Sequence, residues 1–342
     1  MTDSQHSMAK PAASAGNGAA AQTRRLAWQG VRFWTGSVVF LAIAMLIVLS
    51  AESQYVFFVG YVILQFIVLA TGWNILGGYA GYVNFGTAGY FAVGAYTTVA
   101  LFKWLGLPLP VLLLLSGIMG ALLGLAIGAM SMRLRGIYFS IATLAIAIIL
   151  QTVATNWGYV GGARGVSLVA PNPPWPFETT NQLLFFIMAL LVVLSTGVAR
   201  YIERSLVGRG LQALRDDETA AECAGVPTLK LKLLAAAVSG AIMALAGAPF
   251  VFYMSFIEPH SAFSLNYALA AIAMPIIGGM SHWSGPIIGA ILLASAQQVI
   301  SVQLSGEWNV LVTGIILMVF VIGAPSGIVG LARSWYGRRR QS

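Results

Sequence analysis

The sequence RYIERSLVGRGLQALRDDETAAECAGVPTLKLK fills residues 200–232, between the apolar stretches 182–199 and 233–253. Both flanking stretches approach the ~20 apolar residues with which a helix crosses the hydrocarbon core of a bilayer. The polar loop, as we call residues 200–232, is rich in charged and small side chains. A membrane chain gains no stability from keeping such a segment between two spans. We therefore expect membrane-spanning helices joined by a loop that binds a soluble partner.

The composition of the whole chain is that of an integral membrane protein. Of its 342 residues, 58% are hydrophobic and only 8% are charged, whereas soluble domains usually carry about a quarter of charged residues. The 38 glycines fit the same class, because small residues let transmembrane helices approach closely. Cys223 is the single cysteine, which excludes an internal disulfide framework.

Ten apolar segments follow a low-complexity tail, residues 1–33, that we expect to be disordered. The third segment carries glycines throughout and is a candidate broken helix. We therefore predict an all-α, polytopic membrane protein with about ten transmembrane helices. The segments are 34–51, 55–76, 79–101, 109–131, 136–154, 182–199, 233–253, 266–281, 285–303 and 308–325.

Basic residues are distributed unevenly among the loops. If the N-terminus is cytoplasmic and each span reverses direction, all of the 18 Lys and Arg residues except Lys103 and Arg164 fall on the cytoplasmic side. This asymmetry follows the positive-inside rule and predicts an even number of spans, with a basic cytoplasmic tail at residues 326–342. In a membrane protein this distribution matters more than the net charge of +8, so we expect no nucleic-acid partner.

The longest outer loop, residues 155–181, is rich in Gly, Pro and aromatic residues. It is either a plain surface connection or a docking surface for an external partner, and the sequence favours the two interpretations equally.

Several function classes lack the residues that they need. No Asp, Glu, Lys or Arg lies in the middle of a predicted span, which disfavours proton-driven carriers because they need ionisable relays. The chain has no G-x-x-x-x-G-K-[ST] phosphate loop and no metal-ligand or catalytic motif. We therefore expect no enzyme activity, no metal and no cofactor. A sodium site built from backbone carbonyls stays open.

The polar loop itself carries helix signals. Ser205 or Gly208 can begin a helix, and Gly225 can end it, with Pro227 just beyond. Acidic residues on this helix lie between basic flanks, and small residues among them suit a groove of another protein. The alternative is a helix that rests on the lipid surface, but acidic side chains facing anionic lipid are unfavourable. We therefore favour docking to a protein partner.

Five stretches together resemble a known family. They are GRGLQALRDDETAAECAGV (208–226), GYAGYVNFGTAGYFAVGAYT (78–97), RLRGIYFSIATLAIAIILQTVATNW (133–157) with GGARGV (161–166), the stretch 230–265, and IIGGMSHWSGPIIGA (276–290). Their order and spacing over most of residues 55–325 resemble permease subunits of ATP-driven branched-chain amino acid importers. Sister systems for urea and short amides share this scaffold, so a urea or amide importer stays open, as does a sodium-coupled carrier that acts alone.

The resemblance implies an assembly in the bacterial inner membrane. It implies a second homologous permease subunit, two ABC ATPase subunits, a periplasmic substrate-binding protein and contact with membrane lipid. Residues 34–325 would form the permease domain, with residues 200–232 as the cytoplasmic coupling loop and 155–181 as the periplasmic loop. The expected ATPase-coupling residues are Gly208, Arg209, Leu211, Leu214, Arg215, Asp216, Asp217, Glu218, Glu222 and Gly225.

A zwitterionic cargo needs a pathway lined by polar but uncharged groups, because charged walls would hold one end of it too tightly. The candidate pathway residues inside or beside the glycine-rich segment are Tyr82, Asn84 and Thr87, and Tyr138 is a fourth. The alternative is that such residues hold helices together, which is common for buried polar side chains in membranes.

Overall fold

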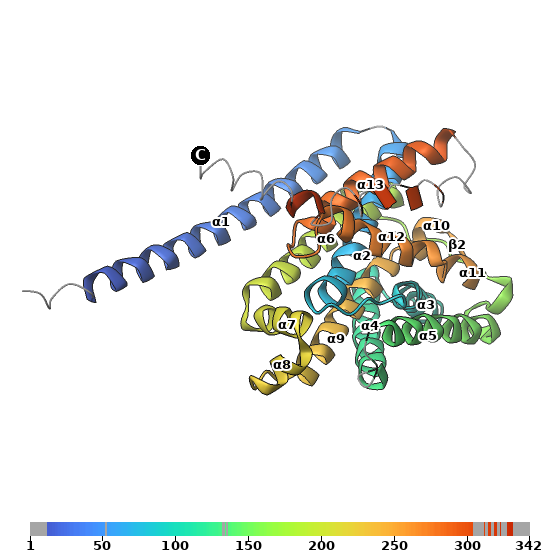
Figure 1. Cartoon of the computed structure of the whole chain (residues 1–342). Coiled ribbons are helices and arrows are strands. Elements are labelled where there is room, and N and C mark those ends of the chain that lie inside the picture. The colour runs from blue at the N-terminus through green and yellow to red at the C-terminus, as the bar shows by residue number, and fades with distance from the viewer. Residues whose placement is uncertain are drawn as a thin grey trace, which may run out of the picture. The chain divides into compact units, whose positions relative to one another are not determined.

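The computed structural model describes residues 12–51, 53–131, 134, 136–303 and, beyond them, positions 311, 314–315, 318–319, 322 and 327–330. The chain is an all-α protein with two very short strands (Figure 1). Its α-helices are α1 (Ala12–Ser50), α2 (Gln54–Asn74), α3 (Thr87–Leu105), α4 (Leu109–Ser131), α5 (Ile137–Asn156), α6 (Thr180–Arg204), α7 (Leu206–Asp216), α8 (Glu218–Cys223), α9 (Thr228–Gly247), α10 (Phe250–Met254), α11 (Pro259–Ala262), α12 (Leu265–Gly278) and α13 (Gly285–Gln303).

Seven helical stretches among the described residues are long and apolar enough to cross a bilayer, which makes the chain a multi-pass membrane protein. Helix α3 and the shorter apolar stretch Gly285–Ile300 of α13 correspond to two further predicted segments. The last predicted segment, 308–325, and the basic tail, 326–342, lie largely outside the described residues. The seven stretches are Gly30–Ser50, Gln54–Tyr79, Leu109–Met130, Ile137–Asn156, Thr180–Arg204, Thr228–Met254 and Pro259–Gly278.

The chain forms two compact units, Met1–Ser50 and Ala51–Ser342. In the first unit, helix α1 begins at Ala12, and residues 1–11 of the expected disordered tail lie outside the described part. The physical reason is the alanine-rich composition after Pro11, because alanine has the highest helix propensity and proline is compatible with a helix start.

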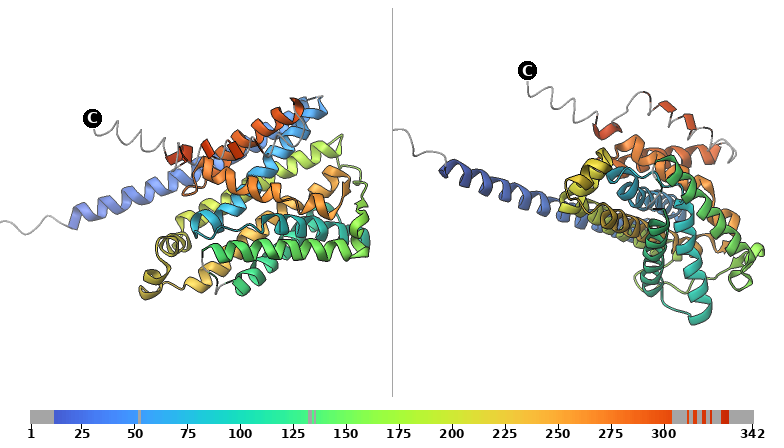
Figure 2. Two further views of the ribbon diagram at one scale, coloured as in Figure 1. Left: turned by 45° about the vertical axis from the view of Figure 1, so that its right-hand side comes forward. Right: turned by 60° about the horizontal axis from the view of Figure 1, so that its bottom comes forward.

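In the second unit, α9 packs against α2, α3 and α4, and α2 packs in turn against α6, α12 and α13 (Figure 2). Glycines bring these helices close together. A Cβ atom on Gly94 of α3 would strike the backbone of Ala244 in α9, and a Cβ atom on Gly120 of α4 would strike the backbone of Gly240. Close approach of this kind is how helices associate in a bilayer, where apolar side chains gain nothing by leaving lipid.

The glycine-rich segment 79–101 is helical only from Thr87 onward. Helix α2 ends in a π-helical turn, Ile75–Tyr79, and residues 80–86 form a non-helical connection that we call the α2–α3 loop. Gly81 has a φ of 78°, which a residue with a side chain rarely adopts. The predicted candidate for a broken helix is therefore a helix preceded by a loop.

On another side of this unit, β1 (Val166–Ser167) pairs antiparallel with β2 (Phe256–Ile257). Strand β1 belongs to the predicted outer loop 155–181, and β2 connects α10 to α11. The pairing therefore ties the long outer loop to the connection that follows α10.

We expect Gly94→Ala to destabilise the folded chain by about 1–3 kcal/mol, the usual cost of an extra methyl group in a tightly packed core. The methyl group would push α3 away from the Ala244 backbone of α9. The apparent Tm of the detergent-solubilised protein should fall. Gly36→Ala is the matched control, because no described atom lies within 4 Å of a Cβ at that position. Equal Tm values for the two variants would contradict the packing argument.

Candidate functional site

The polar loop folds into two short helices rather than one. The side chain of Ser205 caps α7 by accepting a hydrogen bond from the Gly208 amide at 3.3 Å, as the sequence suggested. The predicted single helix, however, is interrupted at Asp217, which corrects that expectation. Asp217 is extended, with φ −158° and ψ 110°, and its carboxylate accepts hydrogen bonds from the amides of Thr219 and Ala220 at 2.9 and 3.0 Å. Aspartate favours this N-cap position, so a second helix begins there.

Helix α7 is anchored on the membrane part by its apolar face. The side chains of Leu211 and Leu214 are 1% and 3% exposed. Gly208 is buried as well, because a Cβ atom there would strike the carbonyl group of Ile202. The hydrophobic spacing of three residues therefore fixes α7 to its own chain.

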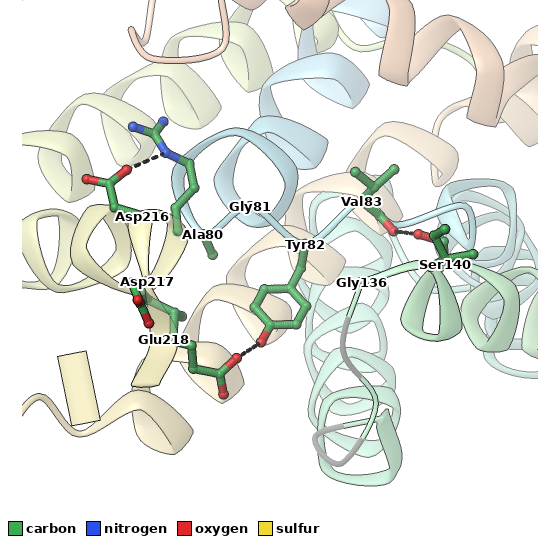
Figure 3. A pocket seen from close by; sticks show the side chains of 12 residues that line it. Ala80, Gly81, Tyr82, Val83, Gly136, Ser140, Asp216, Asp217 and Glu218 are labelled. Carbon is green, nitrogen blue, oxygen red and sulfur yellow. Dashed lines mark hydrogen bonds and ion pairs between the residues drawn. The ribbon is translucent and has the colours of Figure 1, made fainter. Parts of the chain in front are cut away.

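Two side chains of the polar loop reach the segment between α2 and α3. The Arg215 guanidinium donates a hydrogen bond to the carbonyl oxygen of Gly78 at 3.1 Å. The Tyr82 hydroxyl donates to Glu218 Oε2 at 2.6 Å (Figure 3). These contacts place the junction of α7 and α8 directly against the α2–α3 loop.

Glu218 also forms an ion pair with Lys232 of α9. Both side chains are largely buried, with 15% and 8% exposed, and Lys232 Nζ lies 5.0 Å from the centre of the Tyr82 ring. We call Tyr82, Glu218 and Lys232 the Glu218 cluster. Removal of one partner from a buried ion pair costs about 3–5 kcal/mol, because an uncompensated charge is left behind. The cluster is therefore a firm connection between three segments that are distant in the sequence.

The other half of the α2–α3 loop is tied to α5 and α2. Ser140 Oγ donates to the Val83 carbonyl oxygen at 2.8 Å (Figure 3). The Phe85 amide donates to Thr143 Oγ1 at 3.1 Å. Trp73 Nε1 donates to the Asn84 carbonyl oxygen at 2.8 Å. The loop thus bridges the polar loop on one side and the helices α2 and α5 on the other.

A pocket of about 470 Å³ lies where these elements meet. It is lined by the first half of the α2–α3 loop, by the start of α5 and by the junction of α7 and α8. In the described part of the chain, no group of three His, Cys, Asp or Glu side chains is placed to hold a metal ion. The hydrogen bonds and the ion pair of the site join structural elements, which suits the transmission of movement.

The predicted coupling residues divide into three sets. Gly208, Leu211 and Leu214 are buried on this chain. Arg215 and Glu218 bind the α2–α3 loop region. The predicted residues that remain on the exposed face are Arg209, Asp216, Asp217, Glu222 and Gly225.

Two of the four predicted pathway residues are in contact, because Thr87 Oγ1 donates a hydrogen bond to the Asn84 carbonyl oxygen at 3.4 Å. Asn84 and Thr87 are buried at the start of α3, where the Asn84 carboxamide oxygen accepts from the Gly86 amide at 2.7 Å. Tyr82 belongs to the Glu218 cluster, and Tyr138 is 72% exposed on α5. The structure therefore gives Tyr82 and Asn84 roles in shaping the α2–α3 loop.

Sequence reasoning missed two charged residues. Lys232 was read only as part of a basic flank, although its side chain is buried. Glu203 near the end of α6 accepts hydrogen bonds from the Trp283 amide at 2.7 Å and from the Tyr79 hydroxyl at 3.4 Å. Their position could have indicated their role, because each residue lies within about one turn of the end of a predicted span. A charge at such a position must be either solvated or paired.

A family described as "Branched-chain amino acid transport system / permease component" matches residues 55–321. The permease protein LivM of Escherichia coli (strain K12), named for high-affinity branched-chain amino acid transport, is 29% identical over an alignment of 294 positions that covers 78% of this chain and 68% of the relative. The permease LivH of Methanocaldococcus jannaschii, whose name gives branched-chain amino acid transport as probable, is 26% identical over an alignment of 264 positions that covers 72% of this chain and 83% of the relative.

The autoinducer 2 import permease LsrC of Photorhabdus luminescens is 27% identical over an alignment of 234 positions that covers 64% of this chain and 66% of the relative. No solved structure matches the chain at a significant level. Because the matching family covers well over half of the residues, from the start of α2 onward, this chain belongs to the family of branched-chain amino acid transport permeases.

Proposed function

We propose that this chain is one permease subunit of an ATP-driven importer, driven by separate ATPase subunits that dock on α7 and α8. The observation that carries the proposal is the polar loop, which connects α6 to α9 and presents charged side chains outside the candidate spans. The assembly contains a second homologous permease, two ABC ATPases and a periplasmic binding protein. It lies in the bacterial inner membrane, with both termini of this chain in the cytoplasm.

The two faces of the polar loop support docking to a protein. Leu211 and Leu214 hold α7 to its own chain, so the opposite face is free to meet a partner. That face is charged: the side chain of Asp216 is 74% exposed, and Arg209 and Glu222 are exposed as well. Acidic side chains are repelled by anionic lipid headgroups, so a protein cleft suits this face better than a membrane surface does.

The basic residues at the two ends of the polar loop support its cytoplasmic location. Arg200 and Arg204 lie at the end of α6, and Lys230 and Lys232 lie in the first two turns of α9. Such residues concentrate on the cytoplasmic side of membrane proteins. About ten spans result when α3, α13 and the apolar segment 308–325 are added to the seven stretches already described.

Branched-chain amino acids are the proposed cargo, on the family description and on the names of the relatives LivM and LivH. The name of LsrC gives a different cargo to a relative, so cargo chemistry varies on related permeases. A binding protein that presents the cargo from outside accounts for this variation, because the permease then needs only a pathway of neutral polar groups. A urea or amide importer, or a lone sodium-coupled carrier, is the alternative.

Cys223 provides a native reporter of ATPase docking, because it is the single cysteine and is exposed on α8. In inside-out membrane vesicles that lack the ATPases, we expect a membrane-impermeant maleimide to label Cys223. Assembly with the ATPases should slow this labelling at least about tenfold, because the docked protein excludes solvent from α8. The measurement is the rate of maleimide incorporation.

Cys223→Ser is the control, and it should abolish labelling of this chain. Labelling at the same rate with and without the ATPases would contradict docking at α8. Labelling of intact cells from the periplasm would contradict the proposed orientation.

Proteoliposomes that contain both permeases and the ATPases, supplied with the binding protein, should accumulate leucine only when ATP is present. The reason is that this chain shows no ATPase motif of its own, so the energy must come from the partner subunits. Uptake of radiolabelled leucine with ATP and with a non-hydrolysable analogue measures this dependence. Uptake driven by a sodium gradient without ATP would favour the carrier, and uptake of urea in preference to leucine would favour the amide importer.

A further inference from the structure

We propose that Glu218 is the positioning residue through which α8 moves the α2–α3 loop, so that the Glu218 cluster sets how much cargo crosses per ATP hydrolysed. The inference rests on the proposed function, since it assumes that an ATPase moves α7 and α8. It assigns to Tyr82 and Lys232 a part in coupling that is separate from contact with the ATPase.

The cluster is built as a short and stiff connection. Glu218 sits at the first position of α8, directly after the Asp217 cap, so a movement of α8 moves its carboxylate. One carboxylate oxygen accepts from the Tyr82 hydroxyl at 2.6 Å, and the other faces Lys232. Charge-assisted hydrogen bonds of this kind are shorter and stronger than neutral ones. The two protein segments that Glu218 joins are therefore held at a fixed separation.

A second contact stabilises the same connection three residues earlier in the polar loop. Arg215 donates to the Gly78 carbonyl oxygen at 3.1 Å, and its aliphatic part packs on Gly81, where a Cβ would lie 2.7 Å from Arg215 Cγ. Because Gly81 has a φ of 78° and no side chain, the arginine can lie against the loop backbone. The polar loop thus binds residues 78–82 at two points, through Arg215 and through Glu218.

The α2–α3 loop is also the segment in which a change of backbone conformation costs the least free energy. Residues 80–86 lack a helical hydrogen-bond ladder, whereas the helices on both sides have one. Local structure with few backbone hydrogen bonds opens at lower free energy than a packed helix. Movement imposed at Tyr82 therefore shifts this loop, and Val83 and Phe85 pass the shift to α5 through their hydrogen bonds with Ser140 and Thr143.

Coupling of this kind requires that the cluster differ between the two states of the transporter. Tyr82→Phe removes one hydroxyl group and keeps the ring beside Phe139, whose centre lies 5.1 Å away. In the full complex we expect Tyr82→Phe to lower the cargo imported per ATP hydrolysed roughly tenfold, while the ATPases still co-purify and hydrolyse ATP. A merely structural role would lower the amount of complex and leave this ratio unchanged.

Tyr55→Phe is the matched control, because it removes a hydroxyl group from a 57%-exposed tyrosine at the start of α2, outside the polar loop, and should leave the ratio unchanged. The second test compares Lys232→Glu with the exchange Glu218→Lys/Lys232→Glu. We expect the single variant to lose coupling and the exchange to recover part of it.

The inference is overturned if Tyr82→Phe imports as much cargo per ATP hydrolysed as the wild type does. If Tyr82→Phe is not inserted into the membrane, the exchange Glu218→Lys/Lys232→Glu decides. An exchange variant that imports no more cargo per ATP than Lys232→Glu then overturns the inference. Failure of the proposed function looks different, because the wild-type complex would then show no ATP-dependent uptake at all.

Discussion

Buried backbone groups must find hydrogen-bond partners within the protein, and this constraint explains the architecture around the α2–α3 loop. Where α2 stops being helical, side chains from other helices replace the missing ladder. Trp73 donates a hydrogen bond to the Asn84 carbonyl group, and Ser140 donates one to the carbonyl group of Val83. The Thr143 hydroxyl accepts a hydrogen bond from the Phe85 amide. The loop can leave the helical conformation only because α2 and α5 supply these groups, so its shape and the packing of those helices depend on each other.

The same dependence extends to the polar loop. Arg215 satisfies the carbonyl group of Gly78, which lies in the π-helical turn just before the α2–α3 loop. The junction of α7 and α8 is therefore both an exposed surface and part of the hydrogen-bonding environment of the broken segment. A displacement of α7 and α8 changes that environment directly, without a long chain of intermediate contacts.

The sequence predicted much of this fold because its strongest signals are local or compositional. Apolar length located the main helices, and Ser205 correctly marked the start of α7. The break at Asp217 was missed because an aspartate inside an acidic run reads equally well as a helix surface residue. Leu211 and Leu214 were assigned to a partner because spacing identifies an apolar face but does not say which protein covers it. The bond between Tyr82 and Glu218 could not be predicted, because it joins residues 136 positions apart and no local pattern encodes it.

The ion pair between Glu218 and Lys232 is better explained by positioning of the segments that it joins than by stabilisation of the fold. A buried pair of charges gives little net stability compared with well-packed apolar side chains of similar size, since both ions lose their hydration. Position and direction are what such a pair supplies, because its strength depends on geometry in a way that apolar packing does not. The apolar residues Leu211 and Leu214 already anchor α7 to the membrane part. The charged attachment at Glu218 therefore adds little to the anchoring of α7. Its contribution is to define where the α2–α3 loop lies relative to α8 and the start of α9.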